Sequence, residues 1–150
     1  MRKTVVRALL AAMFISMSVT VATRAQASDY PMTQGDYWEV TGVHLKGGGG
    51  LAYAKFLASE WKADQDFAKS KGWIKGYMVL ANAYPRKGEP DLYLIVISDR
   101  LASGPESDKR NDEYLAWKKK TDAQLSKESG DRVEIREIES SELLQEMKFK

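Results

Sequence analysis

Hydrophobic and polar positions follow two different spacings along residues 37–150, and their order predicts an alternation of strands and helices. Residues 37–46 alternate and are rich in β-branched and aromatic side chains, which favours a strand. Residues 92–99 form a nearly continuous apolar run, which is typical of a central strand covered on both faces. The full set of expected elements is strand 37–46, helix 51–71, strands 73–84 and 92–99, helix 109–129, and strands 132–139 and 143–149.

Breakers in the sequence mark where these elements end. Gly72 and Gly130 each follow a segment of helical periodicity and predict the ends of the two helices. The stretch 85–90 contains two prolines and a glycine and predicts a tight, hairpin-like connection. Ser140 and Ser141 interrupt the last apolar segment, so we expect a break or a bulge between the last two strands.

The first predicted strand has two faces, and both carry apolar side chains. One face holds the odd-numbered positions from 37 to 45, and the other holds Trp38, Val40, Gly42 and His44. Because large apolar groups lie on both sides, we expect both faces of the strand to be covered.

Residues 1–27 have the composition of a cleaved signal peptide. Residues 2–7 hold three basic side chains, residues 8–22 are mostly apolar, and Ala25 and Ala27 fit the site that a signal peptidase reads. The apolar run is shorter than the roughly 20 residues of a membrane span and contains hydroxyl groups. We therefore expect export to a bacterial periplasm or secretion, with no membrane attachment after cleavage.

The leader also accounts for the basic character of the whole sequence. It carries four of the 23 basic residues and no acidic one, so the remaining chain has 19 basic and 21 acidic residues, a net charge of −2. Nucleic-acid binding is therefore not expected. The absence of cysteine excludes disulfides and thiolate metal sites. We expect a polar, flexible lead-in at 28–36 and one packed domain at 37–150.

Four consecutive glycines, 47–50, precede the first predicted helix. A glycine-rich loop at a helix N-terminus binds phosphate in some folds. Here no Lys-Ser/Thr pair follows the glycines, and they lack the spacing of a dinucleotide-binding motif. Two interpretations stay open, an anion site and a mobile strand-to-helix loop, and the residues favour the loop.

The order strand, helix, strand, strand, helix, strand resembles the ferredoxin-like plait, an α+β fold with both helices on one face of an antiparallel sheet. Two details narrow the resemblance: the aromatic-rich first helix runs through 71–73 into the next strand, and strand 143–149 extends the plait as an extra C-terminal strand. With these two details, the chain resembles the dimeric α/β-barrel superfamily, which includes antibiotic-biosynthesis-type monooxygenases and NIPSNAP-like proteins. The resemblance implies a homodimer whose sheets enclose a barrel cavity on the side opposite the helices.

Three side chains are candidates for acid–base catalysis. His44 is the single histidine and lies near the end of the first strand, where it is either a base at the mouth of a cavity or an ordinary strand residue. Glu60 and Asp64 are spaced i, i+4 near the apolar face of the first helix, and two carboxylates that close would raise the pKa of one of them. In the alternative interpretation, both acids emerge at the rim of the face and pair with lysines.

Neither a metal nor a cofactor is expected. One histidine and two acids are too few ligands for a dinuclear metal site. Haem-handling members of the superfamily place their ligating histidine on a helix, and neither predicted helix contains one, which leaves a tyrosine as the alternative haem ligand.

Polar and aromatic side chains of the strands are the candidates for ligand contact, namely Trp38, Trp73, Tyr77, Asn82, Tyr93 and Ser98. Such residues hold an electron-rich substrate in cofactor-independent oxygenases of the superfamily, whereas strand aromatics elsewhere serve packing. We expect the protein to bind a small hydrophobic or aromatic molecule in the barrel cavity. The alternatives are a cofactor-independent monooxygenase-type enzyme and a structural dimer without a ligand.

Overall fold

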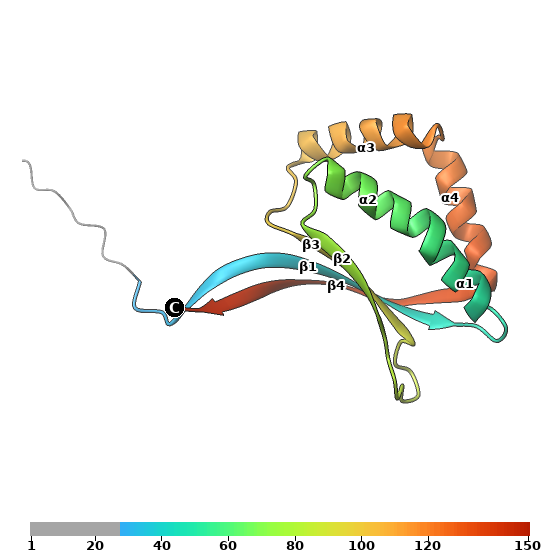
Figure 1. The fold of residues 1–150 in the computed structure, drawn as a ribbon, viewed down its shortest axis with the longest axis horizontal. Helices are drawn as coiled ribbons and strands as arrows, with labels where there is room; N and C mark the ends of the chain where they lie inside the picture. The colour runs from blue at the N-terminus through green and yellow to red at the C-terminus, as the bar shows by residue number, and fades with distance from the viewer. Residues whose placement is uncertain (1–27) are drawn as a thin grey trace, which may run out of the picture.

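The computed structural model describes residues 28–150, and the expected signal peptide lies outside this range. The elements are β1 (Met32–Leu45), α1 (Gly50–Phe56), a π-helical segment (Leu57–Trp61), α2 (Lys62–Ser70), β2 (Gly76–Ala81), β3 (Leu92–Ser98), α3 (Gly104–Lys118), α4 (Asp122–Asp131), a 3-10 turn (Arg132–Glu134) and β4 (Arg136–Phe149) (Figure 1). None of the helices in this part of the chain is long and apolar enough to cross a membrane.

The strands form one antiparallel sheet in the order β2-β3-β1-β4. This confirms the α+β class and the antiparallel sheet predicted from the sequence. β3 has nearly its predicted bounds, whereas β2 starts three residues after Trp73 and ends before Asn82. The ends are lost for two reasons. The ring of Trp73 packs edge-on against Phe67 of α2, 5.4 Å between centroids, and the Asn82 amide donates to the carbonyl of Pro90 at 3.1 Å inside the connection.

The C-terminal part of the chain is one strand of 14 residues, so the predicted extra C-terminal strand is wrong. β4 pairs with β1 along its whole length, and this continuous pairing joins the two expected strands into one. The pairing shifts at Glu139, because Ser140 lies opposite Gly42 while Ile138 lies opposite Val43. The serines therefore mark a bulge, the second of the two forms that the sequence allowed.

β1 begins at Met32, five residues earlier than predicted, so most of the expected lead-in at 28–36 belongs to a strand. This early part pairs with the end of β4, where Met32 lies opposite Phe149. Figure 1 shows the two strands running out beyond β2 and β3 as a two-stranded arm. The prediction failed because the polar residues here are held by pairing with β4 and not by burial of an apolar face.

The first long helix runs from Gly50 to Ser70 and ends at Gly72, which has a φ of +69°. The predicted end is confirmed, since glycine adopts this left-handed conformation without the penalty of a Cβ. Its middle turn is π-helical, a feature that the periodicity of the sequence did not show. The helix packs on the sheet through a small core formed by Val43, Tyr53, Leu57 and Leu94.

The second predicted helix is broken into α3 and α4. Lys119 has a left-handed backbone with a φ of +54°, and Thr121 then begins α4 with a capping box that includes Gln124. Thr121 is therefore a helix cap inside the segment that was predicted as one continuous helix. Gly130 does not end the helix, because α4 continues to Asp131 and passes into a 3-10 turn.

α3 packs on α2 and not on the sheet. Phe67 of α2 stacks on Trp117 of α3 with centroids 4.4 Å apart, and Lys71 pairs with Glu113 at 2.9 Å. Figure 1 shows α3 above α2 on the side away from the sheet, while α4 leads back down to β4. The helices thus form two layers. The first long helix covers the sheet, and α3 lies on top of that helix (Figure 1).

Candidate functional site

The face of the sheet that points away from the helices is largely apolar. Val43 points into the core beneath the first helix, so its neighbours at even positions of β1 point the other way. Directly paired residues share a face, and the register extends this surface across the sheet. We call it the open face, and its apolar members are Trp38, Val40, Met78, Leu80, Tyr93, Ile95, Ile97 and Leu144.

Part of the open face is exposed to solvent. The exposed fractions are 36% for Met78, 48% for Leu80 and 51% for Leu144, while Ile95 at the centre is only 5% exposed. Ile95 is buried without being part of the core beneath the helix, because it lies between Val40 and Met78 on the neighbouring strands. An apolar surface of this kind is an unusual feature of a soluble monomer.

His44 lies at one end of the open face, beside the start of β3. Its Nδ1 is 2.9 Å from Oδ2 of Asp91, and the same oxygen accepts the backbone N–H of Leu45 at 2.7 Å. The backbone N–H of Asp91 in turn donates to the carbonyl of Val43 at 2.9 Å. These contacts orient the imidazole with Nδ1 toward the carboxylate, which leaves Nε2 as the nitrogen available to accept a proton.

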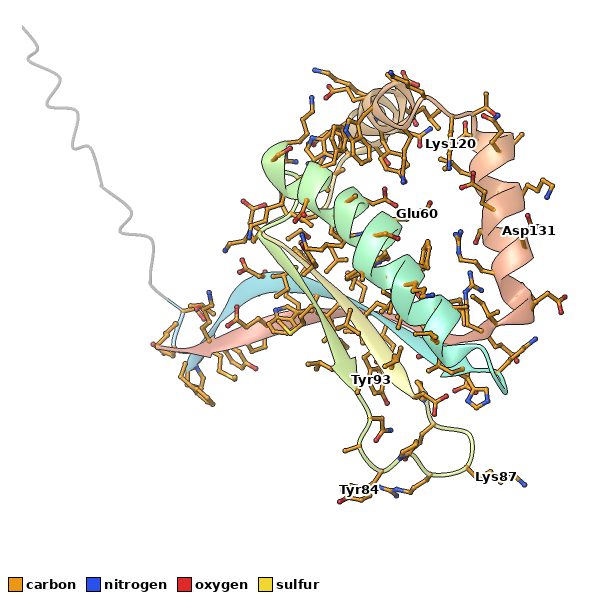
Figure 2. All side chains as sticks on the ribbon, turned by 45° about the vertical axis from the view of Figure 1, so that its right-hand side comes forward. Glu60, Tyr84, Lys87, Tyr93, Lys120 and Asp131 are labelled. Atoms are coloured by element: carbon orange, nitrogen blue, oxygen red, sulfur yellow. The ribbon has the colours of Figure 1, made fainter. Side chains whose placement is uncertain are left out.

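A cavity of about 430 Å³ adjoins His44 and is lined by the connection between β2 and β3, with Arg86, Lys87 and Glu89, and by Glu139 of the bulge. Figure 2 shows Tyr84 and Lys87 at the far tip of this connection, below the sheet, with Tyr93 on the strand that follows. The cavity therefore has charged walls of both signs and one histidine oriented by a carboxylate.

Glu60 and Asp64 lie away from the sheet, between the first long helix and the helices α3 and α4. Together with Tyr114 they line a cavity of about 110 Å³, and Asp64 pairs with Lys118 at 2.6 Å. The side chain of Lys118 is only 12% exposed. Burial raises the pKa of the Tyr114 phenol, and the negative charge of Asp64 raises it further. Asp64 therefore pairs with a lysine, as the alternative interpretation expects for both acids, whereas Glu60 only lines the cavity.

A second ion pair closes the same cavity from α4. Lys120 and Glu128 lie 2.6 Å apart, and Figure 2 shows Glu60 and Lys120 in the space between α2 and α4. The pKa of Glu128 is lowered by its bond to Lys120. Arg132 also lines the cavity, so the cluster holds three acidic and three basic side chains.

The six expected ligand residues do not converge on one cavity. Trp38 and Tyr93 lie on the open face, whereas Tyr77 and Ser98 lie on the helical face of the sheet. Trp73 packs among the helices, and its ring centroid is 5.6 Å from the guanidinium carbon of Arg110. Asn82 lies in the connection between β2 and β3, where its side chain donates to the carbonyl of Pro90. Of the three catalytic candidates, His44 is near the open face, and the two acids are not.

Asp91 is the functional candidate that sequence reasoning did not select. It carries no motif of its own and meets His44 only because β1 and β3 are neighbours in the sheet. In the observed register Leu92 lies opposite Val43, which places residues 91 and 44 side by side, and no pattern within either segment indicates this register.

No group of three or more metal-ligating side chains is present among residues 28–150. Comparison of the chain with family models, with curated proteins and with solved structures gave no match. The functional argument therefore depends on the geometry of the chain itself.

Proposed function

We propose that this protein is an exported homodimer that binds a small hydrophobic or aromatic molecule between the open faces of its two copies. The observation that carries the proposal is the apolar open face. Its exposed leucines and methionine lose contact with water when a second copy covers them, at roughly 25 cal/mol for each Å² of apolar surface. Their position on a regular sheet gives a surface that can pair with itself about a two-fold axis.

The strand order supports a barrel of the dimeric α/β type. β2-β3-β1-β4, with helical connections after β1 and β3, is the order of a ferredoxin-like plait. The position of α3 on top of α2 departs from the simple plait, but it leaves the open face free of helices. Two such faces opposed to one another would enclose a cavity bounded by both sheets.

The chemistry of the open face suits an aromatic ligand. Trp38 and Tyr93 offer flat surfaces for stacking, and the indole N–H of Trp38 is a buried donor without an acceptor among the described residues. An acceptor group of a ligand would reach this N–H only after the side chains that cover it move aside. His44 and Asp91 at the end of the face would then meet the polar end of the molecule.

The dimer is tested by sedimentation velocity of the purified protein at micromolar concentration. We expect a dimer for the unmodified protein and a monomer for Leu80→Glu, which places a charge in the open face. Leu101→Glu is the control, because Leu101 is 52% exposed in a loop outside that face. A monomer for the unmodified protein would refute the proposed assembly.

Ligand binding is tested by native mass spectrometry of the protein purified from the periplasm, without prior detergent. A small molecule that stays with the dimer and is lost in Leu80→Glu would support the proposal. A dimer whose mass equals two bare chains, and which takes up no added aromatic compound, would instead indicate a structural dimer.

The oriented histidine favours a second candidate function, a cofactor-independent monooxygenase-type enzyme. Nε2 of His44 would take the proton of a phenolic hydroxyl, and the electron-rich phenolate would react with dioxygen to give a quinone and water. Asp91 would stabilise the imidazolium that forms. Oxygen uptake with a polycyclic phenol measures this activity, and His44→Ala is expected to abolish it. Absence of turnover in the unmodified protein would leave only the binding function.

A further inference from the structure

A second apolar concavity lies on the other side of the sheet, beneath the first long helix. It has a volume of about 460 Å³, within the range of small-molecule sites. We call it the helix-side groove. Its walls are formed by the helix residues Ala54, Leu57, Ala58 and Trp61 and by the strand residues Val79 and Leu92.

The groove exists because one line of the helix lacks long side chains. Gly50, Ala54 and Ala58 follow one another at intervals of four residues, so they lie along the same side of the helix and stop at Cβ or before it. The π-helical turn contributes Leu57, Ala58 and Trp61 to the lining. Single π-helical turns inside α-helices occur frequently at functional sites.

The charged groups at the rim of the groove bond to one another. Lys62 and Asp66 are 2.6 Å apart, and the hydroxyl of Tyr77 donates to the other oxygen of Asp66 at 2.5 Å. The rings of Trp61 and Tyr77 meet edge to face, with centroids 5.4 Å apart. The lysine charge is therefore already compensated, and the rim presents no charge that calls for an ionic ligand.

We propose that the helix-side groove is a separate binding site for a small, uncharged apolar molecule, such as an aromatic hydrocarbon or a neutral aromatic amine. The carbon-lined walls disfavour a peptide, because a peptide would bring backbone N–H and C=O groups that find no partners on these walls. The compensated rim disfavours an anion, because binding it would require Lys62 to leave Asp66. The site lies on the face of the sheet opposite the proposed dimer cavity, so it does not depend on that cavity.

The test uses two fluorescent probes with the same ring system. N-phenyl-1-naphthylamine is uncharged, and 8-anilino-1-naphthalenesulfonate carries an added sulfonate. We expect the purified protein to bind the uncharged probe at least about tenfold more tightly, which corresponds to about 1.4 kcal/mol. Equal or tighter binding of the sulfonate would overturn the assignment of an uncharged ligand.

Two variants locate the probe. Ala58→Phe fills the groove and is expected to weaken binding of the uncharged probe by about tenfold or more. Ala52→Phe adds the same ring at an exposed position of α1 outside the groove and should leave binding within about twofold. Ala54→Leu narrows the groove from the preceding turn and replaces Ala58→Phe if that variant does not fold.

The variant Leu80→Glu, which we expect to be a monomer, separates this site from the proposed dimer cavity. If the probe binds in the helix-side groove, Leu80→Glu should bind the uncharged probe with the same affinity as the unmodified protein. If Leu80→Glu loses the probe while Ala58→Phe keeps it, the probe lies between the two open faces, and the groove is a packing defect. If the unmodified protein binds neither probe, the groove proposal fails, and the dimer proposal is still judged by sedimentation.

Discussion

The ring of Phe67 lies nearly parallel to that of Trp117, with the centroids 4.4 Å apart and the planes inclined by 15°. This contact joins α2 to α3, which does not pack on the sheet. Trp73 and Tyr114 touch the same phenylalanine ring, with centroids 5.4 and 6.3 Å away. The aromatic contacts between α2 and α3 therefore centre on Phe67, and the ion pairs Lys71–Glu113 and Asp64–Lys118 join the same two helices.

Phe67→Ala is expected to lower the free energy of unfolding by about 2 to 3 kcal/mol, less than a fully buried phenylalanine would because the ring is only half-buried. Chemical denaturation followed by tryptophan fluorescence measures this loss. Tyr84→Ala is the control, because Tyr84 is 90% exposed and should matter by less than about 0.5 kcal/mol. Equal stabilities for the two variants would show that α3 is held by other contacts.

The ion pair between Asp64 and Lys118 is mostly shielded from water, with exposed fractions of 22% and 12%. Removing one partner leaves the other charge half-buried, so Asp64→Asn and Lys118→Met are each expected to cost about 2 kcal/mol. The double variant should cost clearly less than the sum of the two. A double-mutant cycle from urea denaturation gives the coupling, and an additive result would mean that the pair is solvated.

Glu106 gives a prediction about pH. Its bonds to Arg100 and Arg110 lower its pKa to about 2 from the usual 4.5. A folded-state pKa below the unfolded one stabilises the protein above the unfolded value, and this stabilisation is lost as the pH falls through the folded value. The melting temperatures of the unmodified protein and of Glu106→Gln should therefore differ most above pH 4.5 and converge toward pH 2. Added salt should shrink the difference between the two proteins.

The glycine run before α1 yields a matched pair of variants. A Cβ on Gly49 would lie 2.3 Å from the backbone carbonyl oxygen of Ile135, whereas a Cβ on Gly47 would meet nothing within 4 Å. Gly49→Ala is therefore expected to destabilise the fold by about 2 kcal/mol or more, and Gly47→Ala by less than about 0.5 kcal/mol. Thermal unfolding of both decides the point. Similar melting temperatures would show that the loop moves away from Ile135 at little cost.

This geometry also bears on the two interpretations of the glycine run. Gly49 is needed for the close approach to Ile135, and Gly48 has a φ of +81°. Both glycines thus have a structural reason within the loop. A strand-to-helix loop accounts for the run without an anion.

The fold was predicted best where one local signal acts alone. The apolar run at 92–99 and Gly72 at the end of a periodic helix both determined their elements, because burial and backbone conformation leave few alternatives there. The break at Lys119 was missed because 109–129 contains no internal glycine or proline. Its signal was the capping pattern of Thr121 and Gln124, which marks a helix start inside an apparently continuous helix.

The candidate site was predictable only in part. The alternation along β1 correctly separated Trp38 and Val40 from Val43, because pleating alone decides that question. The partner of His44 depends on which strands are neighbours, and the lining of the helix-side groove depends on how far the helix stands from the sheet. Neither the order of the strands nor the distance between the helix and the sheet can be read from the spacing of residues within one segment.

The bulge at Glu139 divides β4 into two parts whose side chains alternate in opposite phase. Ile138 and Leu144 are both even-numbered and would share a side of a regular strand, yet Ile138 lies opposite Val43 on the helical side and Leu144 lies opposite Trp38 on the other. The extra residue Glu139 thus reverses the alternation of side chains along β4 and places Leu144 on the surface that a second copy would cover. If β4 instead continued without a bulge from Ile138, Glu139 would lie opposite Gly42 and Leu143 opposite Trp38, so the rows of side chains on the two sides of the sheet would be exchanged.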